Sequence, residues 1–346
     1  MTILKQVLFL SVTSFFSLNY NAAQGASPGQ LSKEMCEKYS KYVPDTYDCP
    51  FLKESLSIGN QFAESDEFSH MVLLGYKTED SDEIQWSCSA SLISDQYVLA
   101  AAHCLSGHGG HNISVARLGI TDIKDTAHLQ EIKIAELIPH PDYKSPSAYN
   151  DIGLVKLQKK VDISVHTRPA CLYTEKDIGV NQAINSGWGS TEFAGEFNDR
   201  LQKVVLEIYE QEGCNRTYHG RSAKRKIKDG INYNIMLCAG TKTLITNQPN
   251  SGGPLLIVHK EGGKPACLYD IIGVASFGKP GVKKRHSERI HQSVPIYQVD
   301  RGHCLEVDFE FNTAGTTRDE INTNTTKFPT IVRSSSSHAL ANAILI

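Results

Sequence analysis

Ser251 stands in a turn-like run, with Pro249 and Asn250 before it and two glycines and a proline after it. Glycine permits backbone dihedral angles and close approaches that a Cβ atom forbids. Such a turn can expose a serine hydroxyl as a nucleophile and direct backbone N–H groups at the oxygen of the group under attack. Taken alone, the run is also typical of an ordinary loop, so the interpretation depends on the rest of the chain.

Two upstream segments supply the other groups that a nucleophilic serine needs. His103 follows three alanines and a strand-like run over 90–99, and these small residues allow close packing against the histidine. Asp151 precedes the apolar run 152–157, which predicts a buried strand. Separately, the two residues could be a structural histidine and a turn aspartate. In the chain order His, Asp, Ser they match the arrangement in which an aspartate orients a histidine base beside a serine nucleophile.

The segments around these residues predict an all-β domain. From Ile58 on, short β-branched or aromatic runs recur between Gly, Pro, Asn and Asp turns, for example at 71–74, 204–209 and 271–275. This pattern is typical of a β-barrel protein with few helices.

The chain resembles the chymotrypsin/trypsin (S1) family of serine peptidases, and within it the secreted arthropod proteases of the snake and easter type. The resemblance covers residues 34–284. Besides the three residues above, it rests on Trp86-Ser87-Cys88, Arg168-Pro169-Ala170-Cys171-Leu172, Ser186-Gly187-Trp188-Gly189, Leu237-Cys238-Ala239-Gly240 and Ser276-Phe277-Gly278.

The resemblance implies two six-stranded antiparallel β-barrels and a set of site residues. Ser251 would be the nucleophile, His103 the general base and Asp151 the residue that orients its ring. Ser276 and Gly278 would belong to the specificity pocket, where Ser276 to Gly278 pair with the substrate backbone. No cofactor and no metal are implied, and the expected partner is a protein or peptide substrate, or another protease.

The oxyanion hole departs from the family pattern. The family builds it from the N–H of the nucleophile and the N–H of the residue two positions earlier. That residue is Pro249 here, which has no N–H to donate. Losing one such donor costs about 10²–10³-fold in turnover, or about 3–4 kcal/mol. We therefore expect catalysis to be severely impaired.

The activation machinery and the specificity pocket also differ from the family. Leu56 and Ser57 stand at the cleavage junction, where relatives have a basic residue and a new Ile or Val terminus. Asn250 replaces the aspartate that would pair with the new amine, and a buried ammonium without a counter-charge is costly. Ile245 takes the place of the aspartate at the pocket base, and Asn247 that of a cysteine, so the pocket disulfide is missing.

The sequence predicts four segments along the chain. Residues 1–25 are typical of a signal peptide, which predicts an extracellular protein, and 26–57 form a short polar light-chain or pro-segment. The peptidase domain is expected over 58–309, followed by a disordered tail over 310–346 rich in Thr, Asn and Ser. The net charge of −3 gives no reason to expect nucleic acid or an anionic membrane as a partner.

Nine cysteines in such a chain indicate disulfides with one cysteine left over, Cys304. The resemblance assigns Cys88–Cys104 and Cys214–Cys238. For the remaining four it favours Cys49–Cys171 and Cys36–Cys267, although the sequence does not decide between pairings.

The family pattern stops after Lys284. A shifted reading frame from Arg285 onward permits Ala-Ile-Pro-Ser-Val-Tyr-Thr-Ser and later Lys-Trp-Ile-Glu-Ala-Ile-Val-Trp, the strand and helix that end family members. We therefore expect a frameshift near Lys284, and we expect the residues from Arg285 on not to fold with the domain.

Two functions follow from these observations. The first is a weak endopeptidase or a non-catalytic protease homologue that binds a protease, a substrate or a cofactor protein. The alternative is a functioning serine endopeptidase of an extracellular proteolytic cascade. The complete triad favours the enzyme, and Pro249, Asn250 and the junction favour the homologue.

Overall fold

The computed structural model describes residues 29–43, 60–78, 81–106, 111–175, 177–189, 198–218, 221–240, 251–261, 264–278 and 296–298. His103, Asp151 and Ser251 are among them. The proposed signal peptide and the tail over 310–346 lie outside the described residues. The same holds for eight residues named in the sequence analysis: Cys49, Leu56, Ser57, Ile245, Asn247, Pro249, Asn250 and Cys304.

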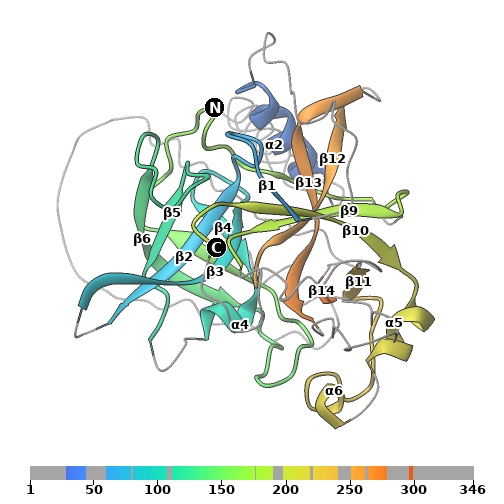
Figure 1. The fold of residues 1–346 in the computed structure, drawn as a ribbon. Helices are drawn as coiled ribbons and strands as arrows, with labels where there is room; N and C mark the ends of the chain where they lie inside the picture. The colour runs from blue at the N-terminus through green and yellow to red at the C-terminus, as the bar shows by residue number, and fades with distance from the viewer. Residues whose placement is uncertain are drawn as a thin grey trace, which may run out of the picture.

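The first half of the molecule is a closed six-stranded antiparallel barrel. Its strands are β2 (Met71–Thr78), β3 (Ser81–Leu92), β4 (Tyr97–Ala100), β5 (Val115–Leu118), β6 (Gln130–Pro139) and β7 (Gly153–Leu157), and they close in the order β2-β3-β4-β7-β6-β5. The barrel lies on one side of the molecule and the second sheet on the other (Figure 1). The predicted strands at 71–74 and 152–157 are confirmed within β2 and β7.

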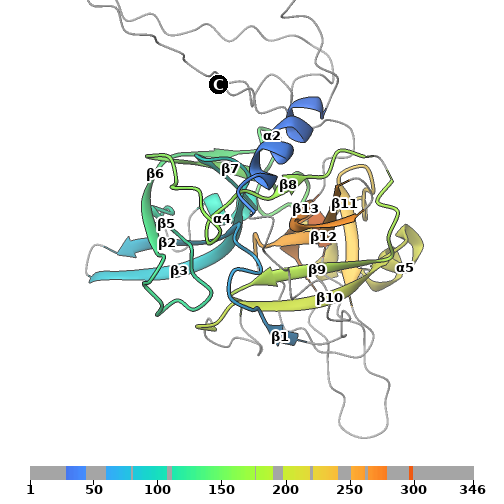
Figure 2. The same cartoon turned by 90° about the horizontal axis from the view of Figure 1, so that it is seen from above.

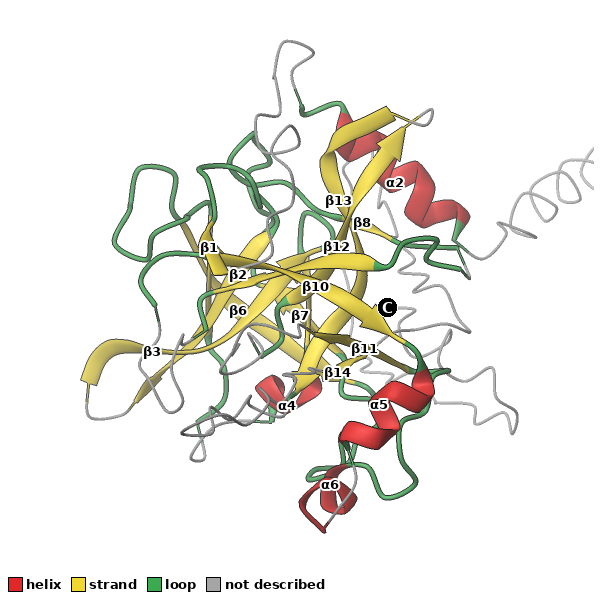
Figure 3. Ribbon diagram, turned by 45° about the vertical axis from the view of Figure 1, so that its right-hand side comes forward, coloured by secondary structure: helices red, strands yellow, loops and turns green. Residues whose placement is uncertain are grey.

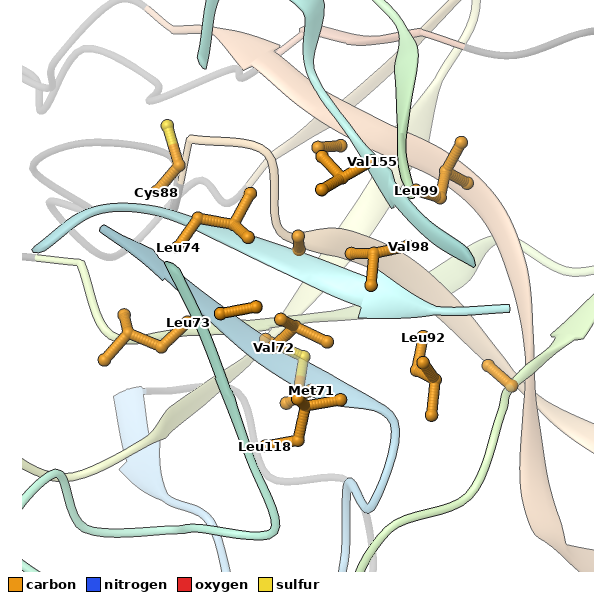
Figure 4. Packing of buried hydrophobic residues seen from close by; sticks show 14 of the residues in the cluster. Met71, Val72, Leu73, Leu74, Cys88, Leu92, Val98, Leu99, Leu118 and Val155 are labelled. Carbon is orange, nitrogen blue, oxygen red and sulfur yellow. The ribbon is translucent and has the colours of Figure 1, made fainter. Parts of the chain in front are cut away.

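The barrel is filled by apolar side chains from every wall. Figure 4 shows Met71, Leu74, Leu92, Val98 and Val155 in this packing, which come from β2, β3, β4 and β7. Each of these five side chains is almost wholly removed from water, so the strands of the barrel are held together by a closed apolar core.

The second half contains an eight-stranded sheet. Its strands are β1 (Asn60–Phe62), β8 (Cys171–Leu172), β9 (Gln182–Gly187), β10 (Gln202–Tyr209), β11 (Met236–Gly240), β12 (Pro254–Glu261), β13 (Lys264–Phe277) and β14 (Ile296–Gln298). Strand β9 pairs with both β12 and β10, so six of the eight strands form a continuous ring of pairings. Strand β8 joins β13 in parallel, and β1 adds to β10.

Strand β14 corrects the expectation that nothing beyond Arg285 joins the domain. Ile296–Gln298 pairs antiparallel with both β11 and β13. The physical reason is that these two strands each offer backbone hydrogen-bonding groups that need a partner, and Ile296 and Tyr297 are residues of high strand propensity.

Among the described residues helices are few, and they lie at the edges of the strands (Figure 3). They are α2 (Gln30–Ser40), α4 (Ala102–Leu105), α5 (Gln211–Thr217) and α6 (Arg221–Lys226). Helix α2 is not among the predicted elements, and it lies beside β8 (Figure 2). Its apolar residues Leu31, Met35, Cys36 and Tyr39 share one helical face, and Cys36 and Tyr39 are buried.

The disulfides confirm part of the expected pairing and correct the rest. Cys88–Cys104 and Cys214–Cys238 are formed as the resemblance implied. The favoured pairs Cys36–Cys267 and Cys49–Cys171 are wrong, because Cys36 is bonded to Cys171. The packing of α2 against β8 places these two Cα atoms 5.1 Å apart, within the range that a disulfide requires.

Candidate active site

His103 is held by a short helix that begins where β4 ends. Ala101 and Ala102 are fully buried, and their small side chains let the α4 turn lie close to the barrel. The backbone N–H of His103 donates to Asp151 Oδ1 at 2.7 Å, and ring Nδ1 lies 2.8 Å from Asp151 Oδ2. Since a carboxylate only accepts, Nδ1 carries the proton and Nε2 is left as the basic nitrogen.

Asp151 is set by the turn that precedes β7. Asn150 has a φ of 58°, a left-handed conformation that asparagine tolerates better than most residues, and the Ile152 N–H donates to the Asn150 carbonyl at 2.8 Å. The turn directs the Asp151 carboxylate inward, where only 3% of the residue is exposed.

The environment of Asp151 keeps it ionised. Burial by itself raises the pKa of this carboxyl, but the hydrogen bonds and charge of His103 and the Ser276 hydroxyl outweigh it. The net result is a pKa below the usual value of an aspartate. Asp151, ionised at neutral pH, can therefore hold the His103 ring in one orientation and stabilise it when it becomes protonated.

Ser276 makes a contact that the sequence analysis did not predict. It lies at the end of β13, with Gly278 just beyond the strand, and its expected pairing with the substrate backbone stays a prediction. Its side chain also donates to Asp151 Oδ2. Nothing local in the sequence distinguishes a serine that supports an aspartate from one that only forms a strand end.

The Ser251 turn is fixed by backbone hydrogen bonds to both halves of the molecule. The Ser251 carbonyl accepts from Ser89 N at 3.0 Å, on β3 of the barrel. Gly252 N donates to the Ala275 carbonyl at 2.9 Å, and Ala275 N donates back to the Gly253 carbonyl at 2.8 Å, on β13. The turn therefore spans the junction between the barrel and the second sheet.

Gly252 brings this turn against the histidine segment. Its φ is 76°, and a Cβ atom here would lie 2.3 Å from Ser89 O and 3.2 Å from Cys104 Sγ. The same sulfur lies 3.7 Å from His103 Nε2, so the nucleophile turn and the imidazole share a neighbour. Among the residues that the structure describes, no hydrogen bond joins the Ser251 hydroxyl to the His103 ring. Such bonds are often long in ligand-free sites and shorten when substrate binds.

Comparison with known proteins identifies the family. The family model described as Trypsin matches residues 57–298, which is most of the chain. The chain belongs to the trypsin family. It is 35% identical over 232 residues to Serine protease snk of Drosophila melanogaster, covering 63% of this chain and 51% of that protein. It is 30% identical over 259 residues to Phenoloxidase-activating factor 3 of Holotrichia diomphalia, covering 70% of each.

Other relatives are of the same kind. Serine protease ea of Drosophila melanogaster is 30% identical over 263 residues, covering 68% of this chain and 64% of that protein. The trypsin-family chain thus spans about half of the snk protein's length and about two thirds of the others'. No helix among the described residues is long and apolar enough to span a membrane.

Within the part of the chain that the structure describes, two clusters have the composition of a metal site. One contains Cys88, His103 and Cys104, and the other contains Cys36, Cys171, His259 and Asp270. In both clusters the cysteines are paired in disulfides, so neither offers the thiolates that bind zinc.

Proposed function

We propose that this protein is an extracellular member of the trypsin family with an assembled triad and a damaged oxyanion hole, so that it is a weak endopeptidase or a non-catalytic protease homologue. The single observation that carries the proposal is the His103–Asp151 pair, held by two hydrogen bonds beside the Ser251 turn, in a chain whose residue 249 is proline. The pair provides the base, and the proline removes a donor.

The division of roles follows from the geometry. With Asp151 accepting at Nδ1, His103 Nε2 would take the proton of the Ser251 hydroxyl as its oxygen attacks a peptide carbonyl. The same imidazole would then give that proton to the leaving amine. Between these steps the former carbonyl oxygen carries a negative charge that backbone N–H groups must stabilise.

Stabilisation of that charge is where this chain is deficient. The N–H of Ser251 supplies one donor, but Pro249 cannot supply the second. The expected cost is about 3–4 kcal/mol, or about 10²–10³-fold in turnover. Leu56 and Ser57 at the junction and the neutral Asn250 remove the usual activation step as well, and Ile245 offers no charge to a substrate Lys or Arg.

The site suits a protein partner or a peptide substrate. Two relatives are named phenoloxidase-activating factors, and this name describes the activation of another enzyme. We therefore place the protein in an extracellular proteolytic cascade, either as a partner that binds a protease or its substrate, or as the functioning endopeptidase that the intact His103–Asp151 pair favours.

A serine-directed fluorophosphonate probe tests the proposal. The purified full chain should label at Ser251 slowly and far below one equivalent, because the phosphonate oxygen needs the same two donors as the substrate oxyanion. His103→Ala and Ser251→Ala provide the background signal. Rapid stoichiometric labelling that His103→Ala abolishes would show an active endopeptidase and overturn the proposed impairment.

A further inference from the structure

Three asparagines of the chain stand in the motif Asn-x-Ser/Thr, to which an N-linked glycan can be attached. They are Asn112, Asn215 and Asn324, and the last of them lies outside the described residues. The motif often occurs by chance, so its structural setting decides whether an asparagine can carry a glycan. Because a glycan is bulky and hydrophilic, it needs a surface asparagine whose side chain is not held against the protein.

Asn112 lies in the segment that leads from α4 to the barrel strand β5. Burial alternates along this segment: Asn112 and Ser114 are exposed, whereas Ile113 and Val115 are buried. This alternation is that of an extended strand, in which successive side chains lie on opposite sides. The two side chains that the motif uses, those of Asn112 and Ser114, therefore share the exposed side of the segment.

The segment around Asn112 is fixed by groups other than the asparagine side chain. The Ser114 N–H donates to the Gly75 carbonyl on β2 at 2.9 Å, and the Ser114 carbonyl accepts from the Ile134 N–H on β6 at 3.1 Å. Ile113, with 4% exposed, anchors the segment in the main core. These contacts use backbone groups and a neighbouring side chain, so a glycan on Asn112 can extend into water without displacing them.

Asn215 has a different setting, although this residue is also exposed. It lies in helix α5 next to Cys214, which is fully buried and bonded to Cys238. Its side-chain oxygen Oδ1 accepts a hydrogen bond from the Ile231 N–H at 3.1 Å, so the amide group is held against the loop before β11. A Cβ atom at Gly230 would lie 3.4 Å from the same oxygen, so the loop passes close to this amide.

We propose that Asn112 carries an N-linked glycan and that Asn215 does not. This rests on the proposed extracellular function, because a chain meets the glycan donor on entering the secretory pathway. In the transfer, Asn112 Nδ2 attacks C1 of the first sugar of a lipid-linked oligosaccharide diphosphate. The bond from C1 to the diphosphate oxygen breaks, the lipid diphosphate leaves with the electron pair, and Nδ2 gives up one proton.

Folding competes with this transfer, because the transferase acts on an extended chain. The Asn112 segment is extended and exposed in the native fold, so folding does not withdraw it. Formation of α5 and of the Cys214–Cys238 bond, in contrast, takes Asn215 out of the extended form. The two asparagines should therefore differ in occupancy, although both stand in the motif.

The experiment expresses the full chain in insect cells in two forms, one with its own residues 1–25 and one with a foreign signal peptide in their place. Both forms carry Asn324→Gln, so that only the two described motifs are scored. Protein from cells and medium is treated with peptide-N-glycosidase A in ¹⁸O-water, which converts each glycosylated asparagine to a labelled aspartate. Mass spectrometry of unreduced peptides should find the label at position 112 and an unmodified Asn215 in the peptide joined through Cys214–Cys238.

Matched variants separate the motif from its setting. Asn112→Gln and Ser114→Ala should each abolish the slower-migrating glycoform on a gel, whereas Ser114→Thr keeps the motif and should keep the glycan. Asn215→Gln is the control and should leave the glycoforms unchanged. Cys238→Ser keeps the second motif but prevents its disulfide, so Asn215 should become partly glycosylated in that variant. An Asn215 that stays unmodified there would contradict folding as the reason for the difference.

The form with the foreign signal peptide decides the proposal. An unmodified Asn112 in that form would overturn it, as would a glycan on Asn215 in protein that contains the Cys214–Cys238 bond. The form with the chain's own residues 1–25 tests the extracellular location separately. If only this form lacks the glycan and stays out of the medium, the proposed location fails and the assignment of Asn112 stands.

Discussion

Gly252→Ala tests whether the Ser251 turn packs as the structure places it. The left-handed φ of 76° costs a residue with a side chain about 1–2 kcal/mol. The new methyl group would also lie 2.3 Å from the Ser89 carbonyl oxygen, a backbone atom of β3 that cannot rotate away. Overpacking of this kind costs about 1–3 kcal/mol more. We therefore expect Gly252→Ala to reduce the free energy of unfolding by about 2–5 kcal/mol.

Gly179→Ala is the matched control for this substitution. Gly179 has a similar φ of 66°, but nothing lies within 4 Å of its Cβ position, so it should lose only the conformational part. Urea unfolding followed by circular dichroism gives the free energy of unfolding of both variants. In thermal melts each kcal/mol corresponds to about 2–4 °C for a chain of this size. Equal losses in the two variants would refute the close approach of the Ser251 turn to β3 and Cys104.

Three further experiments test the buried polar groups. Burial lowers the pKa of His70 from 6.5 to about 3, so between these pH values the unfolded chain binds a proton that the folded chain does not. The free energy of unfolding should therefore fall by about 1.4 kcal/mol per pH unit as pH drops from 6.5 toward 3. His70→Gln should flatten that slope, as measured from urea midpoints, and an unchanged slope would contradict the assignment. Glu67→Gln leaves the Lys203 ammonium without its 2.8 Å partner and should cost about 3–5 kcal/mol, with the added Lys203→Met recovering much of it; a double variant no more stable than the single one would disprove the pairing. Ser276→Ala removes a charge-assisted hydrogen bond to Asp151 and should cost about 1.5–3 kcal/mol at neutral pH in the same assay, whereas a loss within error would show that this bond is not formed.

The part of the site that could be predicted from the sequence is the part marked by local signals. His103 follows a strand and three alanines, and Asp151 precedes an apolar strand, so the residue pattern alone places His103 after β4 and Asp151 before β7, although it does not predict the helix α4. Their mutual distance could not be derived from those signals, because it depends on the pairing of β4 with β7 as neighbours in the barrel wall. The resemblance to a known family supplied that step.

The features that were missed depend on long-range packing. The Cys36–Cys171 pair requires that α2 lie on β8, and no local pattern tells where a short helix docks. The Ser276 hydroxyl reaches Asp151 across 125 residues of chain. Strand β14 forms by pairing with both β11 and β13, whose backbone groups it hydrogen-bonds. Its three residues are too few to give a periodic signal in the sequence. The frameshift near Lys284 stays a prediction, and reading the coding DNA across that codon checks it.

The most direct test of the central claim compares proline and glycine at position 249 in a chain whose activation step has been restored. The background carries Leu56→Arg, Ser57→Ile and Asn250→Asp and is cleaved at residue 56 by trypsin, with the new terminus verified by sequencing. The rate constant for phosphonylation of Ser251 is then measured with and without Pro249→Gly. We expect the added Pro249→Gly to raise that rate constant by about 10²–10³-fold, since it returns the second oxyanion donor. If the cleaved background with Pro249 retained already reacts as fast as the chain carrying Pro249→Gly, the damaged oxyanion hole is contradicted.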